Sequence, residues 1–332
     1  MSSSIRTSIY NPESRYRLSD LTMAISLRAH ERNPWVLERL ALIHEYYPQL
    51  PQVLIVDFGS APEFARRIES ICTAAKFQLV RVDDDGTYSQ ALGRNIAAEH
   101  SSTDLIFFND IDCFGGDGFF ETLLRAVNCS GLARGVDGIL CLPAYHFSEA
   151  ATERVMMQED AARPHCTSEI MSAAVYGARG EEVEYVDPFS NFFVCRKSYF
   201  DLLGGYNASF RGHGSEDFEF LIRFAANGGQ FPLPDDVGAD VYGPARNSFF
   251  ASAKAYRGFR RLGELMAQEA EMSGLRIAHM HHARNTNSSN WYRDHDAKRI
   301  RFREQVAPFL EEPSARLSMD WMPRDKNALV VI

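Results

Sequence analysis

The chain has 332 residues, of which 45% are hydrophobic and 12% aromatic, which is enough apolar material for one large or two small globular domains. The formal net charge of -9 argues against a broad basic surface and against a nucleic-acid partner. The N-terminal stretch has no apolar core of signal-peptide length, and no run approaches the roughly 18 apolar residues of a membrane span, so we expect a cytoplasmic protein. The six cysteines form no CxxC pair, so we expect free, mostly buried thiols.

The first third of the chain alternates apolar runs of strand length with helical patterns. Strands are predicted at 21–27, 53–56, 77–82 and 105–108, and helices at 34–47, 62–75 and 90–99. This alternation predicts an α/β fold with a mainly parallel sheet flanked by helices. Ligands of such folds bind beyond the carboxyl ends of the strands, so residues there are the first candidates for a site.

Acidic residues directly follow two of these strands. Asp57 comes after the second strand, and Asp110 and Asp112 follow the fourth. On extended backbone, Asp110 and Asp112 project to the same side while Ile111 points away from it. Two hard oxygen ligands that face one way suit a Mg²⁺ or Mn²⁺ ion, which keeps water and phosphate oxygens as its other ligands. An Asp-x-Asp often occurs by chance, and its position after an apolar strand is what indicates function.

A glycine-rich stretch, residues 204–214, leads into a helical pattern that begins with acidic residues. Ser215 is the expected N-cap, and Glu216 and Asp217 then lie in the first turn, where the helix dipole favours negative charge. Capping chemistry explains such acids as well as catalysis does. The helix start alone therefore leaves both explanations open.

Three histidines, His279, His281 and His282, stand at the end of a later apolar run of strand character. Clustered histidines are metal ligands more often than single ones are, because imidazole nitrogen binds divalent cations well. A surface cluster explains the same pattern, and both explanations stay open.

The chain is expected to comprise a catalytic domain at 1–290 and a C-terminal helical extension and tail at 291–332. Residues 140–147 and 192–195 are predicted to form two more strands. The polar segment 148–184 is expected to be an inserted helical or mobile segment, either a lid over an acceptor site or a plain surface excursion. The arginine-rich pattern of the extension fits a solvated helix as well as peripheral contact with the inner face of a membrane.

Six short motifs follow one another in order between residues 20 and 285. They are Arg28, Asp57-Phe58-Gly59-Ser60, Arg94-Asn95, Asp110-Ile111-Asp112, Gly204 to Asp217, and His279-Met280-His281-His282-Ala283-Arg284. In this order they resemble the inverting glycosyltransferases of family 2, which have the GT-A fold, and the second half is similar to galactosyltransferases and chondroitin-type polymerases. The resemblance implies a GT-A, Rossmann-like, mainly parallel sheet flanked by helices. The helical insertion at 148–184 and the C-terminal helical extension are expected from the sequence pattern, and the insertion matches nothing in the family.

The resemblance implies a nucleotide-sugar site made by the earlier motifs. Asp57 would accept a hydrogen bond from the nucleotide base, and Asp110 would hold the ribose or a metal-bound water. Arg28, Arg94 and Asn95 occupy the remaining family positions and would also bind the nucleotide sugar.

The same resemblance implies a metal site. Asp112 would bind Mn²⁺ or Mg²⁺, with Asp110 beside it and His282 completing the shell. Arg284 and the metal would neutralise the negative charge that develops on the departing diphosphate.

Asp217 would be the general base that takes the proton from the acceptor hydroxyl, and Glu216 would bind the acceptor or assist. The sequence departs from the family pattern at three positions. Phe58 replaces the commoner second Asp, His281 stands where Trp is frequent, and Ala283 stands where Pro is frequent. Because of Phe58, the contact with the base depends on Asp57 alone. The departures at His281 and Ala283 leave open which of the three histidines binds the metal.

We therefore expect a metal-dependent inverting glycosyltransferase that moves a sugar of the Gal, GalNAc or GlcNAc type from a UDP-sugar to a hydroxyl of a glycan or lipid-linked saccharide in surface polysaccharide synthesis. A nucleotidyltransferase is one alternative, but it would ordinarily carry a glycine-rich phosphate loop where Arg28 is followed by Ala29-His30-Glu31. A non-catalytic nucleotide-sugar-binding module of a synthase complex is the other. Such a module needs no general base, and Asp217 is a candidate for one.

Overall fold

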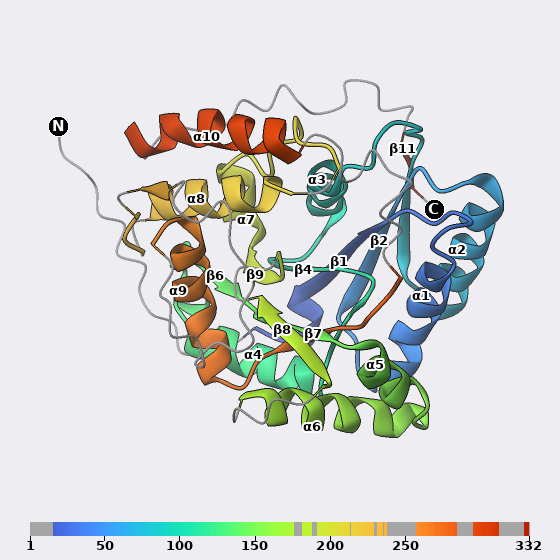
Figure 1. Ribbon diagram of the computed structural model, residues 1–332. Helices are drawn as coiled ribbons and strands as arrows, with labels where there is room; N and C mark the ends of the chain where they lie inside the picture. The colour runs from blue at the N-terminus through green and yellow to red at the C-terminus, as the bar shows by residue number, and fades with distance from the viewer. Residues whose placement is uncertain are drawn as a thin grey trace.

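A seven-stranded sheet forms the centre of the computed structural model (Figure 1). The structure describes residues 16–175, 181–187, 191–212, 214–228, 231–234, 236–237, 257–283, 295–311 and 329–331. The strands, in spatial order, are β11 (Leu329–Val331), β3 (Gln78–Val82), β2 (Gln52–Phe58), β1 (Leu21–Leu27), β4 (Leu105–Asn109), β9 (Phe193–Arg196) and β6 (Ile139–Cys141). β3, β2, β1 and β4 run parallel, while β9 and β11 are antiparallel to β4 and β3. The expected mainly parallel α/β sheet is confirmed.

Helices cover both faces of this sheet. They are α1 (Trp35–Tyr46), α2 (Pro62–Ala75), α3 (Gln90–His100), α4 (Phe119–Cys129), α5 (Glu149–Met156), α6 (Arg163–Val175), α7 (Lys197–Leu202), α8 (Glu216–Gly228), α9 (Phe259–Met272) and α10 (His295–Glu311), with short 3₁₀ helices at Leu18–Asp20, Leu132–Arg134 and Asp160–Ala162. Alternate residues of β1 point to opposite faces, so Met23 and Ile25 join one hydrophobic core with α1, α2 and α4. Ala24 joins the other core, with α3, α7, α8 and α9.

Local sequence chemistry marks the ends of α2 and the start of α3. Pro62 occupies the first position of α2, where its missing N–H has no partner to lose. The same helix ends at Lys76, which adopts the left-handed conformation at φ 58°. Ser89 caps α3 by accepting a hydrogen bond from the Leu92 N–H at 3.2 Å. These local signals explain why the predicted helices at 62–75 and 90–99 lie within a residue of the observed ones.

A second, four-stranded sheet has the order β5-β10-β7-β8, formed by β5 (Cys113–Gly115), β10 (Ile277–His279), β7 (Ala144–Phe147) and β8 (Val183–Asp187). The single strand predicted at 140–147 is wrong, because its two halves are β6 in the large sheet and β7 in the small one. Leu142 and Pro143 separate them, and Pro143 has no N–H for a ladder. Its carbonyl instead accepts from Ile277 N at 3.1 Å and so leads into the second sheet.

The segment 148–184 contains α5, α6 and the start of β8. Both helices contribute to the core next to α1, through Val155 and Ile170 among others. Tyr46 of α1 also donates a hydrogen bond to Thr167 Oγ1 at 2.7 Å. The described part of this segment is therefore anchored to α1 by buried contacts, although its outer side is exposed.

Helices α8 and α10 run side by side along one side of the molecule (Figure 1). Phe218 of α8 packs against Phe259 of α9, with ring centroids 4.2 Å apart, and Phe302 of α10 completes this aromatic cluster. None of the helices that the structure describes has the length and apolar character of a membrane span. The six cysteines are free and five are buried, as expected.

Candidate active site

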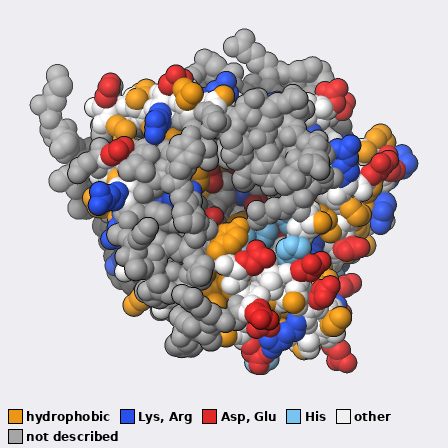
Figure 2. All heavy atoms as spheres, in the orientation of Figure 1, with side chains coloured by type: hydrophobic (Ala, Val, Ile, Leu, Met, Phe, Trp, Pro, Cys, Tyr) orange, Lys and Arg blue, Asp and Glu red, His pale blue; other side chains and the backbone are white. Residues whose placement is uncertain are grey.

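The predicted site residues that the structure describes lie after β1, β2 and β4, in α3, after β10 and at the start of α8. Figure 2 shows a hollow on this face, with acidic side chains inside it and histidine side chains at its edge. The β1 and β2 register pairs Leu27 with Asp57, and the β1 and β4 register pairs Ile25 with Asn109. The strand ends that precede Asp57 and Asp110 therefore lie at one edge of the sheet.

Asp112, His279 and His282 form the one cluster in the described part of the chain whose side-chain atoms could hold a metal ion together. Their potential ligand atoms all lie within 4.8 Å of one another. Asp112 Oδ2 lies 3.0 Å from His282 Nε2 and 3.4 Å from His279 Nε2. β10 brings these residues together, because it pairs with β5 so that His279 lies opposite Cys113, the residue after Asp112.

The charges in this cluster suit a cation. Burial acts to raise the pKa of Asp112, but His279 and His282 outweigh burial and hold that pKa well below its usual value. One ionised carboxylate oxygen and two imidazole nitrogens are thus directed at one point. These are ligand types that divalent transition metals accept.

The backbone of His281, which follows β10, is held by hydrogen bonds to other elements. Its N–H donates to Thr152 Oγ1 at 2.7 Å, and its carbonyl accepts from Arg39 Nη2 at 3.3 Å. Of the three candidate histidines, the structure therefore brings His279 and His282 to Asp112 and ties His281 to α5 and α1.

Asp110 lies outside this cluster and makes different contacts. Its Oδ1 accepts from Arg94 Nη2 at 2.7 Å and also from the side chain of Gln90. Burial raises the pKa of Asp110, Arg94 opposes that rise, and Asp112 adds to it. The role of Asp110 as a metal ligand stays a prediction.

Arg94 and Asn95 of α3 connect Asp110, which follows β4, to the loop that contains Gly205 and Tyr206. Arg94 is 1% exposed, and its Nη1 donates to the Tyr206 hydroxyl at 3.2 Å. Asn95 Nδ2 donates to the Tyr206 carbonyl at 2.8 Å, and its Oδ1 accepts from Tyr206 N at 2.7 Å. Gly205 is required next to this contact, because its φ is +66° and a Cβ there would lie 2.4 Å from Asn95 Oδ1.

Asp57 is fully buried at the end of β2. Its Oδ2 lies 3.2 Å from both Nε and Nη2 of Arg81, and its Oδ1 accepts from Ser60 N at 3.1 Å. In this structure its polar atoms thus hold neighbouring protein groups.

The Arg28 side chain donates to three carbonyls, those of Phe58, Asp84 (2.7 Å) and Gly86 (2.6 Å). It therefore ties the end of β1 to the end of β2 and to the loop after β3. Gly59 is required beside it, since its φ is +75° and a Cβ would meet the Asp84 carbonyl at 1.9 Å.

Asp217 is half-buried in the first turn of α8, where its Oδ1 accepts from Phe218 N at 2.9 Å. Burial raises the pKa of Asp217 to about 6, and the Phe218 N–H and the Arg94 charge only partly offset it. A carboxylate with this pKa is ionised at neutral pH yet holds a proton far better than an ordinary aspartate. Arg94 thus influences the candidate base and also contacts Asp110.

Ser215 precedes α8, and its carbonyl accepts from Glu219 N at 3.1 Å, as expected of the residue before a helix. Its φ, however, is +83°, in the left-handed region that non-glycine residues rarely occupy. Such a conformation costs on the order of 1–3 kcal/mol and occurs preferentially at functional sites. This strain lies directly before Glu216 and Asp217.

Glu219 and Arg223 form a fully buried ion pair within α8, and neither residue belongs to the motifs predicted from the sequence to form the site. Arg223 Nη1 donates to the Leu203 carbonyl at 2.6 Å and its Nη2 to the Gly205 carbonyl at 2.7 Å. The pair therefore anchors the loop that carries Tyr206. An i,i+4 pair of opposite charges within the apolar stripe of a predicted helix is the signal that could have found it.

Arg284, the last of the predicted site residues, lies outside the residues that the structure describes.

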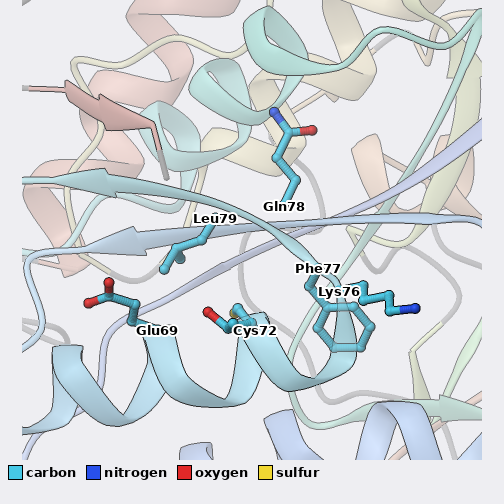
Figure 3. A pocket seen from close by; sticks show the side chains of 7 residues that line it. Glu69, Cys72, Lys76, Phe77, Gln78 and Leu79 are labelled. Carbon is cyan, nitrogen blue, oxygen red and sulfur yellow. The ribbon is translucent and has the colours of Figure 1, made fainter.

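A separate pocket of about 350 Å³, lined by Glu69, Cys72, Lys76 and Gln78 among others, lies between the end of α2 and the start of β3 (Figure 3). Because β3 begins there, the pocket is at the amino end of the sheet, away from Asp57 and Asp112.

Residues 22–307 match the family described as "Glycosyltransferase like family 2", and the chain belongs to this family. The expected enzyme class, a glycosyltransferase, and the expected GT-A type of fold are thereby confirmed. No curated protein matches the sequence. The similarity of the second half to chondroitin-type polymerases stays a prediction.

Solved structures similar to this chain include those of S. aureus TarS. The TarS structure is 10% identical over 62% of this chain and 33% of that chain, with a TM-score of 0.40. The fragment TarS 1-349 is 10% identical over 63% and 56%, with a TM-score of 0.41. The same fragment in complex with UDP-GlcNAc is 11% identical over 38% and 35%, with a TM-score of 0.31. This chain therefore covers from a third to just over half of their length.

Proposed function

We propose that this glycosyltransferase is metal-dependent and inverting, and that it moves a sugar from a UDP-sugar to a hydroxyl of a glycan or lipid-linked saccharide in surface polysaccharide synthesis. The observation that carries the proposal is the pairing of two features near one sheet edge. One is the Asp112, His279 and His282 cluster, and the other is the half-buried carboxylate of Asp217, whose pKa is raised to about 6. A binding module would need the first feature without the second.

The residues present fit a divalent cation, since one carboxylate oxygen and two imidazole nitrogens converge within 4.8 Å. Asp112, His279 and His282 would hold it. The two nitrogen ligands favour Mn²⁺ or a similar transition metal over Mg²⁺, which prefers oxygen ligands. When bound, such a cation supplies positive charge against the diphosphate that departs from the donor sugar.

Asp217 is the proposed general base. It would accept the proton of the acceptor hydroxyl as that oxygen attacks the anomeric carbon from the face opposite the nucleotide, which inverts the configuration. Burial raises its pKa to about 6, which matches a base that operates near neutral pH. Glu216 precedes it in the same helical turn and is proposed to bind the acceptor.

The remaining predicted residues are proposed to shape the donor site. Arg94 would fix the Asp110 carboxylate toward the ribose or a metal-bound water, because it donates to Asp110 at 2.7 Å. Asn95 and Arg28 would shape the donor site indirectly. Asn95 holds the backbone of Tyr206, and Arg28 holds the carbonyls of Phe58, Asp84 and Gly86. Asp57 keeps its proposed contact with the base.

Two parts of the proposal come from the motif resemblance. They are the charge-neutralising role of Arg284 and the identity of the donor as UDP-galactose, UDP-N-acetylgalactosamine or a related hexosamine. The reaction is also proposed to take place in the cytoplasm.

Donor binding and turnover of three variants test the assignment of roles. UDP- and GDP-sugars are titrated with Mn²⁺ or Mg²⁺ into the wild type, Asp112→Ala and Asp217→Asn. We expect one UDP-sugar to bind with metal, Asp112→Ala to lose that binding, and Asp217→Asn to keep it while turnover falls about 10²- to 10⁴-fold.

Asp117→Asn is the matched control, because Asp117 is an exposed carboxylate that pairs with His165 on the surface. It should behave as the wild type does. The proposal would fail if no nucleotide sugar bound with either metal, or if Asp217→Asn kept full turnover.

A further inference from the structure

The indole ring of Trp35 stacks on the imidazole ring of His282. The ring centroids are 4.2 Å apart and the planes differ by 16°. Trp35 is the first residue of α1. The loop before it is fixed, since Asn33 Nδ2 donates to the Arg28 carbonyl at 2.8 Å and His30 N donates to Asn33 Oδ1 at 2.7 Å. The indole is therefore held against His282 from a rigid element.

Among the described residues, none gives His282 the support that a metal-binding histidine usually has. Such a histidine normally donates its second ring N–H to a carboxylate, a carbonyl or a water, and that hydrogen bond fixes the orientation of the ring. The second ring nitrogen of His282, Nδ1, is buried and has no hydrogen-bond partner among the groups that the structure describes. Besides the contact of its Nε2 with Asp112, the stacked indole is thus the neighbour that restricts rotation of this ring.

The other candidate ligand also lies in a stack of rings. His279 stacks on His146 at 4.3 Å, and His146 stacks on Tyr185 at 4.0 Å. His279 and His282 therefore each have an aromatic neighbour on another element, and their own ring centroids are 5.5 Å apart. Stacked aromatic pairs contribute about 0.5–1.5 kcal/mol beyond the area they bury.

We propose that Trp35 is a positioning residue that orients His282 for the divalent cation by ring stacking. The proposal rests on the metal dependence proposed above. Loss of the indole would let the His282 ring rotate, so the cation would bind more weakly. The reaction at saturating metal would change little, because Trp35 stacks on the ligand and acts through it.

Mn²⁺ affinity of the metal-free protein is the direct test, measured from the electron paramagnetic resonance signal of free Mn²⁺. We expect Trp35→Leu to weaken binding about three- to tenfold, which corresponds to the energy of one aromatic stack. Trp35→Phe keeps a ring at this position and should bind within about twofold of the wild type. In turnover, Trp35→Leu should require more Mn²⁺ for half-maximal rate and keep its kcat at saturation.

Leu40→Ala is the matched control for a general loss of stability. Leu40 is a fully buried residue of the same helix, in the core that α1 shares with β1. Its truncation should lower the free energy of unfolding and leave the Mn²⁺ affinity of the folded protein unchanged.

Fluorescence supplies a second readout, since Trp35 is one of three tryptophans in the chain. Mn²⁺ held by His282 should quench the emission of the indole stacked on that ring. The metal-dependent quenching should therefore be smaller in Trp35→Phe than in the wild type.

The outcomes separate this proposal from the proposed function. Undiminished Mn²⁺ affinity of Trp35→Leu, in a wild type that binds the ion, would overturn the positioning role alone. A wild type that binds neither Mn²⁺ nor Mg²⁺ would overturn the positioning role and the metal dependence together.

Discussion

Asp217 combines burial with a position at a helix start, and these act on its proton in opposite directions. Burial favours the neutral acid and raises its pKa to about 6, whereas the Phe218 N–H and the Arg94 charge favour the carboxylate. The larger effect is burial. The same carboxylate is therefore costly to ionise in the folded chain and, once ionised, more basic than an exposed aspartate.

This pKa predicts the acid side of the pH profile. With Mn²⁺ kept saturating, kcat should fall about tenfold per pH unit as the pH drops below about 6, because the protonated acid cannot accept a proton. A kcat that stays level down to about pH 4.5 would contradict the role of Asp217 as base.

A stability measurement checks the same pKa independently of turnover. The folded pKa lies above the unfolded value of 3.8, so ionised Asp217 lowers stability as the pH rises from about 4 to about 6, and the full cost remains above that. Asp217→Asn should therefore raise the free energy of unfolding by about 1–3 kcal/mol near pH 8 and change it little near pH 4.

At the scale of elements, α3 delivers Arg94 and Asn95 to the site, and its distance from β1 is set by Gly93. A Cβ on Gly93 would lie 2.0 Å from Ser26 Oγ and 2.7 Å from Ser26 Cβ. Both Arg94 and Asn95 follow directly, so a displaced helix would move both from Asp110 and Tyr206.

Gly93→Ala should lower the free energy of unfolding by about 1–3 kcal/mol, beyond any gain in helix propensity, because the extra methyl group overpacks the contact with β1. Turnover should fall as well, since both polar side chains shift. Urea unfolding and kcat measure the two effects.

Two further variants make this prediction specific. Ser26→Gly combined with Gly93→Ala should recover part of the loss, because it removes the atoms that the new methyl meets. Glu99→Ala, at an exposed position of the same helix, should change stability by less than about 0.5 kcal/mol. If Gly93→Ala were as stable as the wild type, the prediction would be wrong, and α3 would tolerate a wider separation from β1.

At the scale of the whole molecule, the metal cluster joins parts of the chain that only the folded state brings together. Asp112 lies after β4, and His279 and His282 lie in and after β10. An unfolded chain cannot present these three groups at once, so a cation that binds them stabilises the fold by mass action.

Mn²⁺ at about 100 times its dissociation constant should add about 2.7 kcal/mol to the free energy of unfolding, seen as a rise of several degrees in Tm. Asp112→Ala should abolish the rise. His165→Ala, which removes an exposed histidine outside the cluster, should keep it. A wild-type Tm that does not respond to Mn²⁺ would count against the site.

The residues of the candidate site that follow strands could be picked out from the sequence. Those whose place depends on contacts between distant segments could not. Asp112 and His282 were singled out from their sequence context, and the structure brings them within 3.0 Å. His279 could not be chosen over His281, because the choice is made by the pairing of β10 with β5 and by the hydrogen bond from His281 N to Thr152.

The sequence by itself determined the early strands and helices and the residues at their ends. Hydrophobic periodicity and caps such as Ser89 act over a few neighbouring residues, so they can be recognised along the chain. Only the tertiary structure decided that residues 140–147 divide between two sheets and that Arg223 and Glu219 form a buried pair under the Tyr206 loop. It also decided the raised pKa of Asp217, because burial is produced by segments distant in sequence and no local pattern specifies it.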